Sequence, residues 1–386
     1  MPNSATRFAI SAPTVFDGER FLHNHCVIVV ANTVTQLLPV QDCPAGLDTV
    51  VLEQGILAPG LIDLQVNGGG DLLFNNAPSC ATLNTMLSAH RATGTTAMLP
   101  TVVSDTPAVQ QAAVDAIRQA RADDLHGILG IHLEGPFFDL AKCGAHNASM
   151  IRPPQAPDIQ WLCAIQDLRV IVTLAPEHTQ PGQIEQLVEA GILVCAGHTN
   201  ATYQQVQQAT RQGLHGITHL FNAMSPLTSR EPGAVGAALD DDNLWAGIIA
   251  DGHHVHPASI RLALSAKPAG KLVLVSDAMA TVGGKNRSFA IYGEQIHESE
   301  GRLVNAKGVL AGSAIGMIDA VRYTHQTVGL PLAECLRMAS LYPATILKLD
   351  ASLGRLTSGY QADLVHFDQD FTVRNTWVAG QRAAHN

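Results

Sequence analysis

The stretch that decides the fold runs from residue 169 to residue 221 and reads RVIVTLAPEHTQPGQIEQLVEAGILVCAGHTNATYQQVQQATRQGLHGITHLF. Three short apolar runs, at 169–176, 192–198 and 216–221, alternate with two segments whose apolar residues have helical spacing. Both of those segments end in glycine, as helices commonly do just past their last turn. Strands that alternate with helices indicate a parallel α/β sheet.

The same alternation extends in both directions along the chain. Near-continuous apolar runs, typical of parallel strands buried on both faces, also lie at 55–66, 95–103, 127–135, 245–252 and 271–278. Eight such strands predict closure into a (β/α)8 barrel over residues 55–351. The two ends of the chain, 1–54 and 352–386, resemble short β-hairpins instead, and we expect them to form one small β-sandwich-like domain together.

The composition is that of an ordinary globular protein and excludes several classes of function. Of the 386 residues, 46% are hydrophobic and 15% are charged, and the formal net charge is −10. No basic run is present to follow a phosphate backbone, so we expect no nucleic-acid partner. No apolar run approaches the roughly 18–20 residues that span a bilayer, and no secretory signal is visible.

Cysteine usage indicates the compartment. The seven cysteines are odd in number, widely spaced and free of any Cys-x-x-Cys motif. This pattern favours free thiols over a disulfide framework or a thiolate zinc site. We therefore expect a cytoplasmic protein with no membrane partner.

Ionisable side chains collect where the predicted strands end, which is where function gathers in a parallel barrel. The residues at four of these ends are Glu134, His198, His219 and Asp277. Each by itself could be a hydrogen-bonding or helix-capping residue. A cluster of them at one end of a barrel is costly to bury unless its members are paired or bind a metal.

Two imidazoles and one carboxylate form a common ligand set for a catalytic divalent metal. We therefore predict that Glu134, His198 and His219 bind one ion per subunit, with zinc favoured and iron, manganese or cobalt as alternatives. Such an ion lowers the pKa of a coordinated water. Asp277 is not needed as a ligand, and it is the candidate general acid/base that moves the proton of that water.

The first predicted barrel strand contains LIDLQVN at 61–67, where many metal-dependent hydrolases carry Asp-x-His-x-His. Asp63, Gln65 and Asn67 share one face, because alternate side chains of a strand point the same way. Gln65 and Asn67 are weak, neutral ligands. We expect them to hydrogen-bond a metal ligand or its water rather than to hold a second ion.

Several histidines near these positions have open roles. His132 either supports Glu134 or packs inside the barrel. Asp251, His253 and His256 are interpreted as mostly structural, because a strand end directs only alternate residues inward.

These residues belong to a set of motifs, namely HLEGP, GAHN, AGHTNAT, THLFNAM, REPG, IADGHHV, LVSDA and LAGSAIGM. Over nearly the whole chain the set closely resembles the N-acetylglucosamine-6-phosphate deacetylases, a family of the amidohydrolase superfamily. The resemblance implies an amidohydrolase-type barrel, the same metal ligands and acid/base residue, and a catalytic His146 that polarises the acetamide carbonyl. The substrate contacts that it implies are Ala145, Asn222, Ala223, Arg230, His254, Leu310, Ala311 and Gly312.

The implied reaction removes the acetyl group from N-acetyl-D-glucosamine 6-phosphate and gives glucosamine 6-phosphate and acetate. Arg230 and His254 are the hypothesised clamp for the phosphate of this small-molecule partner, since a few cations at short range suffice to bind it. A salt bridge between Arg230 and Glu231 is the alternative for the arginine. The resemblance also implies a homodimer.

Three other functions compete with this interpretation. One hydroxyl inversion separates the implied substrate from N-acetylgalactosamine 6-phosphate, and no residue decides between the two. A cyclic-amide hydrolase of the same superfamily usually carries the His-x-His strand and often a bridging modified lysine, neither of which can be placed in this sequence. An inactive metal-binding scaffold would not need Asp277 beside three ligands.

Overall fold

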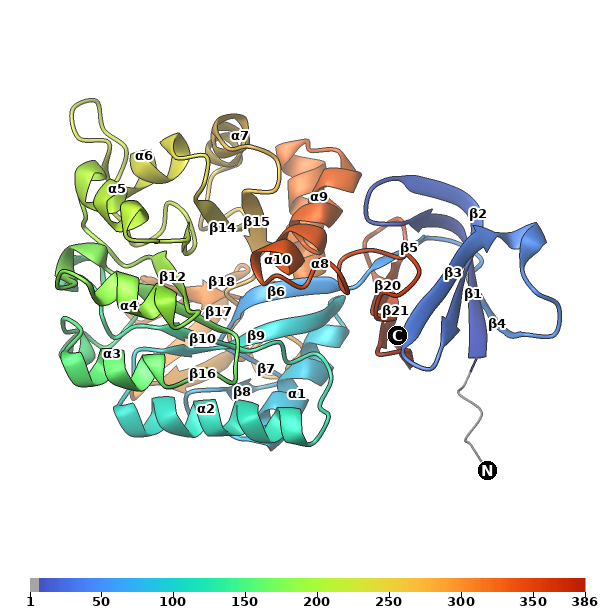
Figure 1. Ribbon diagram of the computed structural model, residues 1–386, viewed down its shortest axis with the longest axis horizontal. Helices are drawn as coiled ribbons and strands as arrows, with labels where there is room; N and C mark the ends of the chain where they lie inside the picture. The colour runs from blue at the N-terminus through green and yellow to red at the C-terminus, as the bar shows by residue number, and fades with distance from the viewer. Residues whose placement is uncertain (1–6, 386) are drawn as a thin grey trace.

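The computed structural model describes residues 7–385 and shows a β/α barrel beside a small β-domain (Figure 1). Eight parallel strands follow one another around the barrel in chain order, and a parallel bridge between Val66 and Ala278 joins the last to the first. The strands are β6 (Leu61–Val66), β9 (Thr95–Val103), β10 (Ile131–Glu134), β11 (Val170–Leu174), β12 (Leu193–Ala196), β13 (Gly216–Ile217), β14 (Trp245–Ile249) and β15 (Leu272–Val275). The predicted (β/α)8 barrel is confirmed.

Helices lie between successive strands and cover the outside of the barrel (Figure 1). Thr106 caps α2 (Pro107–Ala122), since its side chain accepts a hydrogen bond from the N–H of Val109. The two helices of the fold-deciding stretch are α4 (Gln183–Glu189) and α5 (Tyr203–Arg211). The others are α1 (Cys80–Arg91), α3 (Ala156–Cys163), α6 (Gly233–Asp240), α7 (Pro257–Ala266), α8 (Met317–Tyr323), α9 (Leu332–Met338) and α10 (Leu341–Ile346).

Both ends of the chain build one mixed sheet, as predicted. Its strand order is β22-β21-β20-β5-β1-β2-β3, with β4 paired to β1. The red C-terminal strands and the blue N-terminal strands lie side by side in Figure 1, because β20 pairs with β5. The strands are β1 (Arg7–Phe16), β2 (Phe21–Val30), β3 (Thr33–Pro39), β4 (Asp48–Val51), β5 (Ile56–Pro59), β20 (Leu364–Phe367), β21 (Val373–Val378) and β22 (Gln381–Ala384).

The expectation of one strand over 55–66 was wrong. β5 belongs to the terminal sheet and β6 to the barrel, and the chain passes between them at Gly60. A Cβ at Gly60 would lie 2.0 Å from the hydroxyl oxygen of Thr96, so only glycine allows this close approach of backbone to barrel strand. The apolar run is continuous because both strands are buried, and for this reason hydropathy does not reveal the break.

A four-stranded antiparallel sheet between β15 and α8 was not predicted. It consists of β16 (Ser288–Ile291), β17 (Glu294–Ser299), β18 (Arg302–Val304) and β19 (Leu310–Ser313). A bridge from Ala278 to Ser313 attaches it next to the end of β15. A smaller hairpin, β7 (Gly68–Gly69) and β8 (Leu72–Leu73), follows β6. Both additions stand at the carboxyl ends of the barrel strands.

Two further expectations can be compared with the structure. All seven cysteines are free thiols, as predicted. Among residues 7–385, none of the helices combines the length and apolar character that crossing a bilayer requires.

Candidate active site

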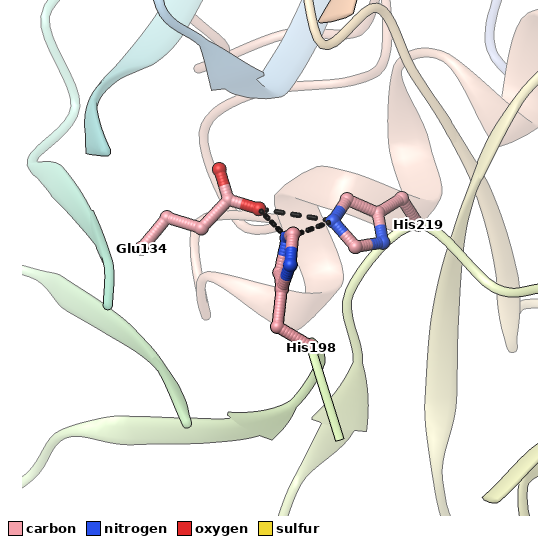
Figure 2. Close-up of side chains that lie close together, drawn as sticks. All are labelled: Glu134, His198 and His219. Atoms are coloured by element: carbon pink, nitrogen blue, oxygen red, sulfur yellow. Dashed lines mark hydrogen bonds and ion pairs between the residues drawn. The ribbon is translucent and has the colours of Figure 1, made fainter. Parts of the chain in front are cut away.

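Glu134, His198 and His219 converge at the carboxyl ends of three barrel strands (Figure 2). The Nε2 of His219 lies 3.0 Å from the Oε1 of Glu134 and 3.0 Å from the Nε2 of His198. The Nε2 of His198 lies 3.3 Å from the same carboxylate oxygen. All three side chains are buried, so the structure brings the predicted metal ligands around one point that is shielded from solvent.

Three electron-rich atoms at such short distances require at least one proton or a cation between them. Burial disfavours the charged form, but the contacts with His198 and His219 hold the pKa of the Glu134 carboxyl well below its usual value. Burial also acts against the charged form of His219, yet the hydrogen bond to Glu134 raises the pKa of His219. A proton supplies the positive charge in this arrangement, and a divalent cation can take its place.

The donor set fits a divalent metal. His198 donates its Nδ1–H to the carbonyl oxygen of Lys142 over 2.9 Å, which leaves the lone pair of Nε2 directed at the centre. The carboxylate of Glu134 also accepts from the amide of Gln65 over 3.1 Å, which orients it. Two imidazole Nε2 atoms and one oriented carboxylate are the ligands that catalytic zinc and related ions prefer.

The backbone is strained at three of the candidate site residues. His198 (φ +48°), His219 (φ +33°) and Asp277 (φ +52°) all adopt the left-handed conformation, which non-glycine residues rarely take. Each such residue costs on the order of 1–3 kcal/mol and persists only where its surroundings hold it, a pattern that clusters at functional sites.

Asp277 lies beside the three ligands and is held by the first barrel strand. Its Oδ1 accepts from Asn67 Nδ2 over 2.7 Å and from Gln65 Nε2 over 3.2 Å. Burial, together with the negative charge of Glu134, raises the pKa of Asp277 to about 6. A carboxyl group with that pKa can both accept and release a proton near neutral pH.

His146 is held as a neutral hydrogen-bond donor. Its Nδ1 accepts the backbone N–H of Ser104 over 3.2 Å, and the Ser104 hydroxyl lies 2.8 Å from the same nitrogen. Since a backbone N–H can only donate, the ring proton of His146 resides on Nε2. Burial lowers the pKa of His146 to about 3, so the ring stays uncharged and presents an N–H.

A cavity of about 530 Å³ opens over these residues and is large enough for a phosphorylated sugar. Glu134, His198, His219, Asp277, His146 and Asn67 all face it. The expected substrate-contact residues that line it are Ala145, Asn222, Ala223, His254, Leu310, Ala311 and Gly312.

Arg230 differs from the other expected contacts. It is exposed and does not line the cavity of its own chain, and among residues 7–385 it forms no ion pair. The carboxylate of Glu231 accepts from the backbone N–H groups of Tyr203 and Gly233 instead. Within one chain, therefore, neither the clamp with His254 nor the pair with Glu231 is formed.

The open histidine and aspartate roles become clear from their partners. His132 contacts the Leu64 carbonyl and the Thr173 hydroxyl through its two ring nitrogens, so it packs inside the barrel. Asp251 accepts the Nδ1–H of His254 over 2.6 Å and thereby orients a histidine that lines the cavity.

Some cavity residues were missed by the sequence analysis. Tyr292 and Ile291 come from the unpredicted sheet, and Lys142 precedes His146 in the same loop. Lys142 could have been noticed as a cation beside GAHN. Tyr292 carries no local signal, because only the folding of its sheet brings it to the barrel mouth.

A (β/α)8 barrel in which three strand ends bring together a candidate set of metal ligands, beside a separate aspartate, is typical of a metal-dependent hydrolase. The amidohydrolase family model matches residues 56–383, and the chain belongs to this family.

Within this family, the chain is similar to individual known enzymes. It is 44% identical over 332 residues to an N-acetylgalactosamine-6-phosphate deacetylase of Shewanella sp. (strain ANA-3), covering 86% of this chain and 84% of that one. The crystal structure of N-acetylglucosamine-6-phosphate deacetylase from Pasteurella multocida has a TM-score of 0.95 at 37% identity, covering 98% of this chain and 100% of that one. A mutant of the Mycobacterium smegmatis enzyme, in complex with N-acetyl-D-glucosamine-6-phosphate, has a TM-score of 0.89 at 32% identity, covering 98% and 99%. The resemblance drawn from the motifs is confirmed.

Proposed function

We propose that this chain is a deacetylase that converts N-acetyl-D-glucosamine 6-phosphate to glucosamine 6-phosphate and acetate. The observation that carries the proposal is the meeting of Glu134, His198, His219 and Asp277 in one cavity of sufficient volume. The names of the similar Pasteurella multocida and Mycobacterium smegmatis enzymes support the choice of substrate.

The proposal includes one divalent metal ion per subunit, held by Glu134, His198 and His219. Zinc is favoured by the ligand set, with iron, manganese and cobalt as alternatives. When bound, such an ion polarises the amide carbonyl and lowers the pKa of a coordinated water. Gln65 and Asn67 occupy the positions where a second ion would need histidines, and their amides donate to Asp277 instead.

The chain's own residues then move one proton and stabilise one developing charge. Asp277 accepts the proton of the attacking water on Oδ2, because Oδ1 is occupied by the amides of Asn67 and Gln65. It returns that proton to the sugar nitrogen as the C–N bond breaks. His146 donates its Nε2–H to the carbonyl oxygen as negative charge builds up there.

The substrate phosphate needs cations at the cavity mouth. Lys142 and His254 line the cavity, and the carboxylate of Asp251 orients His254 by accepting its Nδ1–H. Arg230 is still proposed to bind the phosphate. Unlike Lys142 and His254, it lies in an exposed loop of its own chain.

N-acetylgalactosamine 6-phosphate is the second candidate substrate. It is favoured by the 44% identity to a deacetylase named for that sugar phosphate. The two compounds differ in the configuration of one hydroxyl group, and both carry the acetamide and the phosphate on which the proposed mechanism depends.

The test is acetate release by the purified protein from both sugar phosphates and from both unphosphorylated sugars, together with metal analysis. We expect about one ion per chain and the highest kcat/KM on N-acetylglucosamine 6-phosphate. A higher value on the galactosamine compound would assign the second candidate. Absence of acetate release from both phosphates, with the metal present, would refute the proposed function.

Two further parts of the proposal concern the setting of the enzyme. We propose a homodimer, which light scattering on the purified protein tests directly. The free thiols support a cytoplasmic location, since reducing conditions preserve them.

A further inference from the structure

The turn that carries His198 is held from outside by two consecutive residues, Glu177 and His178. They lie in η4 (Pro176–His178), at the carboxyl end of β11. Neither lines the cavity, and neither has a role in the proposed mechanism. Their hydrogen bonds nevertheless lead directly to a metal ligand.

Glu177 fixes the two residues that follow His198. One carboxylate oxygen accepts from the hydroxyl of Thr199 over 2.5 Å, and the other accepts from the backbone N–H of Asn200 over 2.6 Å. Thr199 is fully buried, and its hydroxyl oxygen accepts in turn from the N–H of Ala201 over 3.0 Å. Charged acceptors make short, strong hydrogen bonds, so the chain direction after His198 is firmly set.

His178 acts on the other side of the same turn. Its Nε2 lies 2.9 Å from the Oδ2 of Asp139, and the backbone N–H of Asp139 donates to the carbonyl oxygen of His198 over 2.9 Å. The segment that begins at Asp139 also provides the Lys142 carbonyl that orients the His198 ring. The backbone and the ring of His198 are therefore both tied to a segment that η4 anchors.

This support matters because His198 has a φ of +48°. A strained turn persists only where its surroundings hold it. Without Glu177, the buried hydroxyl of Thr199 loses its acceptor and the turn can relax, which would move the imidazole away from the centre. We propose that Glu177 is a positioning residue for the metal centre, which acts through Thr199 and Asn200 on the ligand His198.

The neighbouring carboxylates also permit a different role. Ligand atoms of Asp139, Glu177 and His178 lie within 4.8 Å of one another, as a second ion would require. Their carboxylate oxygens, however, already accept hydrogen bonds, including that from the N–H of Ala141 to Asp139 over 2.9 Å. The geometry points to a hydrogen-bonded support rather than to an ion site.

The experiment measures metal affinity rather than turnover. The zinc Kd of the full-length protein is determined by chelator competition for the wild type, Glu177→Ala, Thr199→Val and the double variant. We expect Glu177→Ala to raise Kd about 10- to 100-fold. The double variant should be little worse than the weaker-binding single variant, since each single variant already removes the contact between Glu177 and Thr199. The control Glu189→Ala removes an exposed carboxylate from the adjacent α4 and should leave Kd unchanged.

This inference rests on the metal centre of the proposed function, and the two are contradicted by different results of this experiment. A wild type that binds no ion contradicts the proposed function. A wild type that binds one ion, with an unchanged Kd in folded Glu177→Ala, overturns the inference alone, as does a second ion per chain that this variant loses. If Glu177→Ala fails to fold, the isosteric Glu177→Gln decides: a raised Kd supports the inference, and an unchanged Kd overturns it.

Discussion

At the scale of single residues, the site depends on groups whose protonation is set by their contacts. Asp277 is half-buried and accepts two amide hydrogen bonds on one oxygen, which leaves the other free for proton transfer. Its raised pKa keeps the proton exchangeable near neutrality. His146 differs from Asp277, because Ser104 keeps its Nδ1 unprotonated and burial keeps its ring neutral by lowering its pKa.

The first prediction concerns Asp277→Asn. The amide cannot accept the water proton, so kcat should fall about 10²- to 10⁴-fold, the usual contribution of general acid–base catalysis. The three ligands are untouched, and metal content by elemental analysis should stay at the wild-type level. A variant with near-normal kcat would contradict the assignment of the proton to this residue.

The second prediction concerns pH and Asp63. Burial raises the pKa of Asp63 to about 7, although Ser276 and Gln65 donate hydrogen bonds to it. The native state therefore binds one more proton than the unfolded chain between about pH 4 and pH 7. The stability that this extra proton gives the native state is complete below about pH 4 and is lost as the pH rises to about 7.

Asp63→Asn removes this titration and keeps the acceptor oxygen for the two backbone donors. We expect the stability of the variant, relative to the wild type, to increase from pH 4 to pH 7 by up to about 4 kcal/mol. Thermal unfolding at several pH values measures this difference. A constant difference in melting temperature across the window would contradict the raised pKa.

At the scale of elements, a hydrogen bond links the unpredicted β16–β19 sheet to Ser104, the residue that follows β9. Tyr292, which directly follows β16, donates its hydroxyl to the carbonyl oxygen of Ser104 over 2.5 Å. Ser104 in turn contacts His146. Tyr292 therefore contacts Ser104, the residue that holds His146 at the barrel mouth. The added sheet also forms part of the cavity wall.

The third prediction is that Tyr292→Phe raises KM. Loss of the hydroxyl leaves the Ser104 carbonyl without this partner and should cost about 1 kcal/mol of stability. Tyr360→Phe is a matched control, because Tyr360 donates a similar bond of 2.6 Å to the Asp350 carbonyl and does not line the cavity. Both variants should lose similar stability, and only Tyr292→Phe should change the steady-state kinetics. An equal KM in both would contradict the link.

At the scale of the whole molecule, the proposed metal centre joins strands that are far apart in sequence. Glu134 and His219 are separated by 85 residues and meet only because the barrel closes. An ion bound between them stabilises the native state, because the unfolded chain does not assemble the site.

The fourth prediction follows from this linkage. Metal at about 100 times its Kd should stabilise the protein by about 2.7 kcal/mol and raise the melting temperature above that of the chelated protein. Glu134→Gln removes the charged ligand and should abolish most of the increase, as calorimetry with and without the ion will show. A shift of equal size in Glu134→Gln would indicate that the ion binds elsewhere.

Much of this molecule could be predicted from local sequence. Buried parallel strands are apolar throughout, so all eight barrel strands were visible as hydrophobic runs, and the fixed polarity of a barrel made their final residues candidates for chemistry. The β16–β19 sheet was not visible, because its short antiparallel strands mix exposed and buried residues and lack such runs. The break is marked in the sequence by Pro59 and Gly60, but hydropathy alone does not show it, because both flanking strands are buried.

The sequence by itself therefore determined the architecture and the kinds of residue that face the cavity, because hydropathy and strand ends are properties of short segments. Only the tertiary structure decided how those residues work: the left-handed turn at His198, the tautomer of His146 and the support from Glu177. Each of these depends on a hydrogen bond between groups that are distant in the chain, and such a partner is chosen when the barrel closes, not by neighbours in sequence.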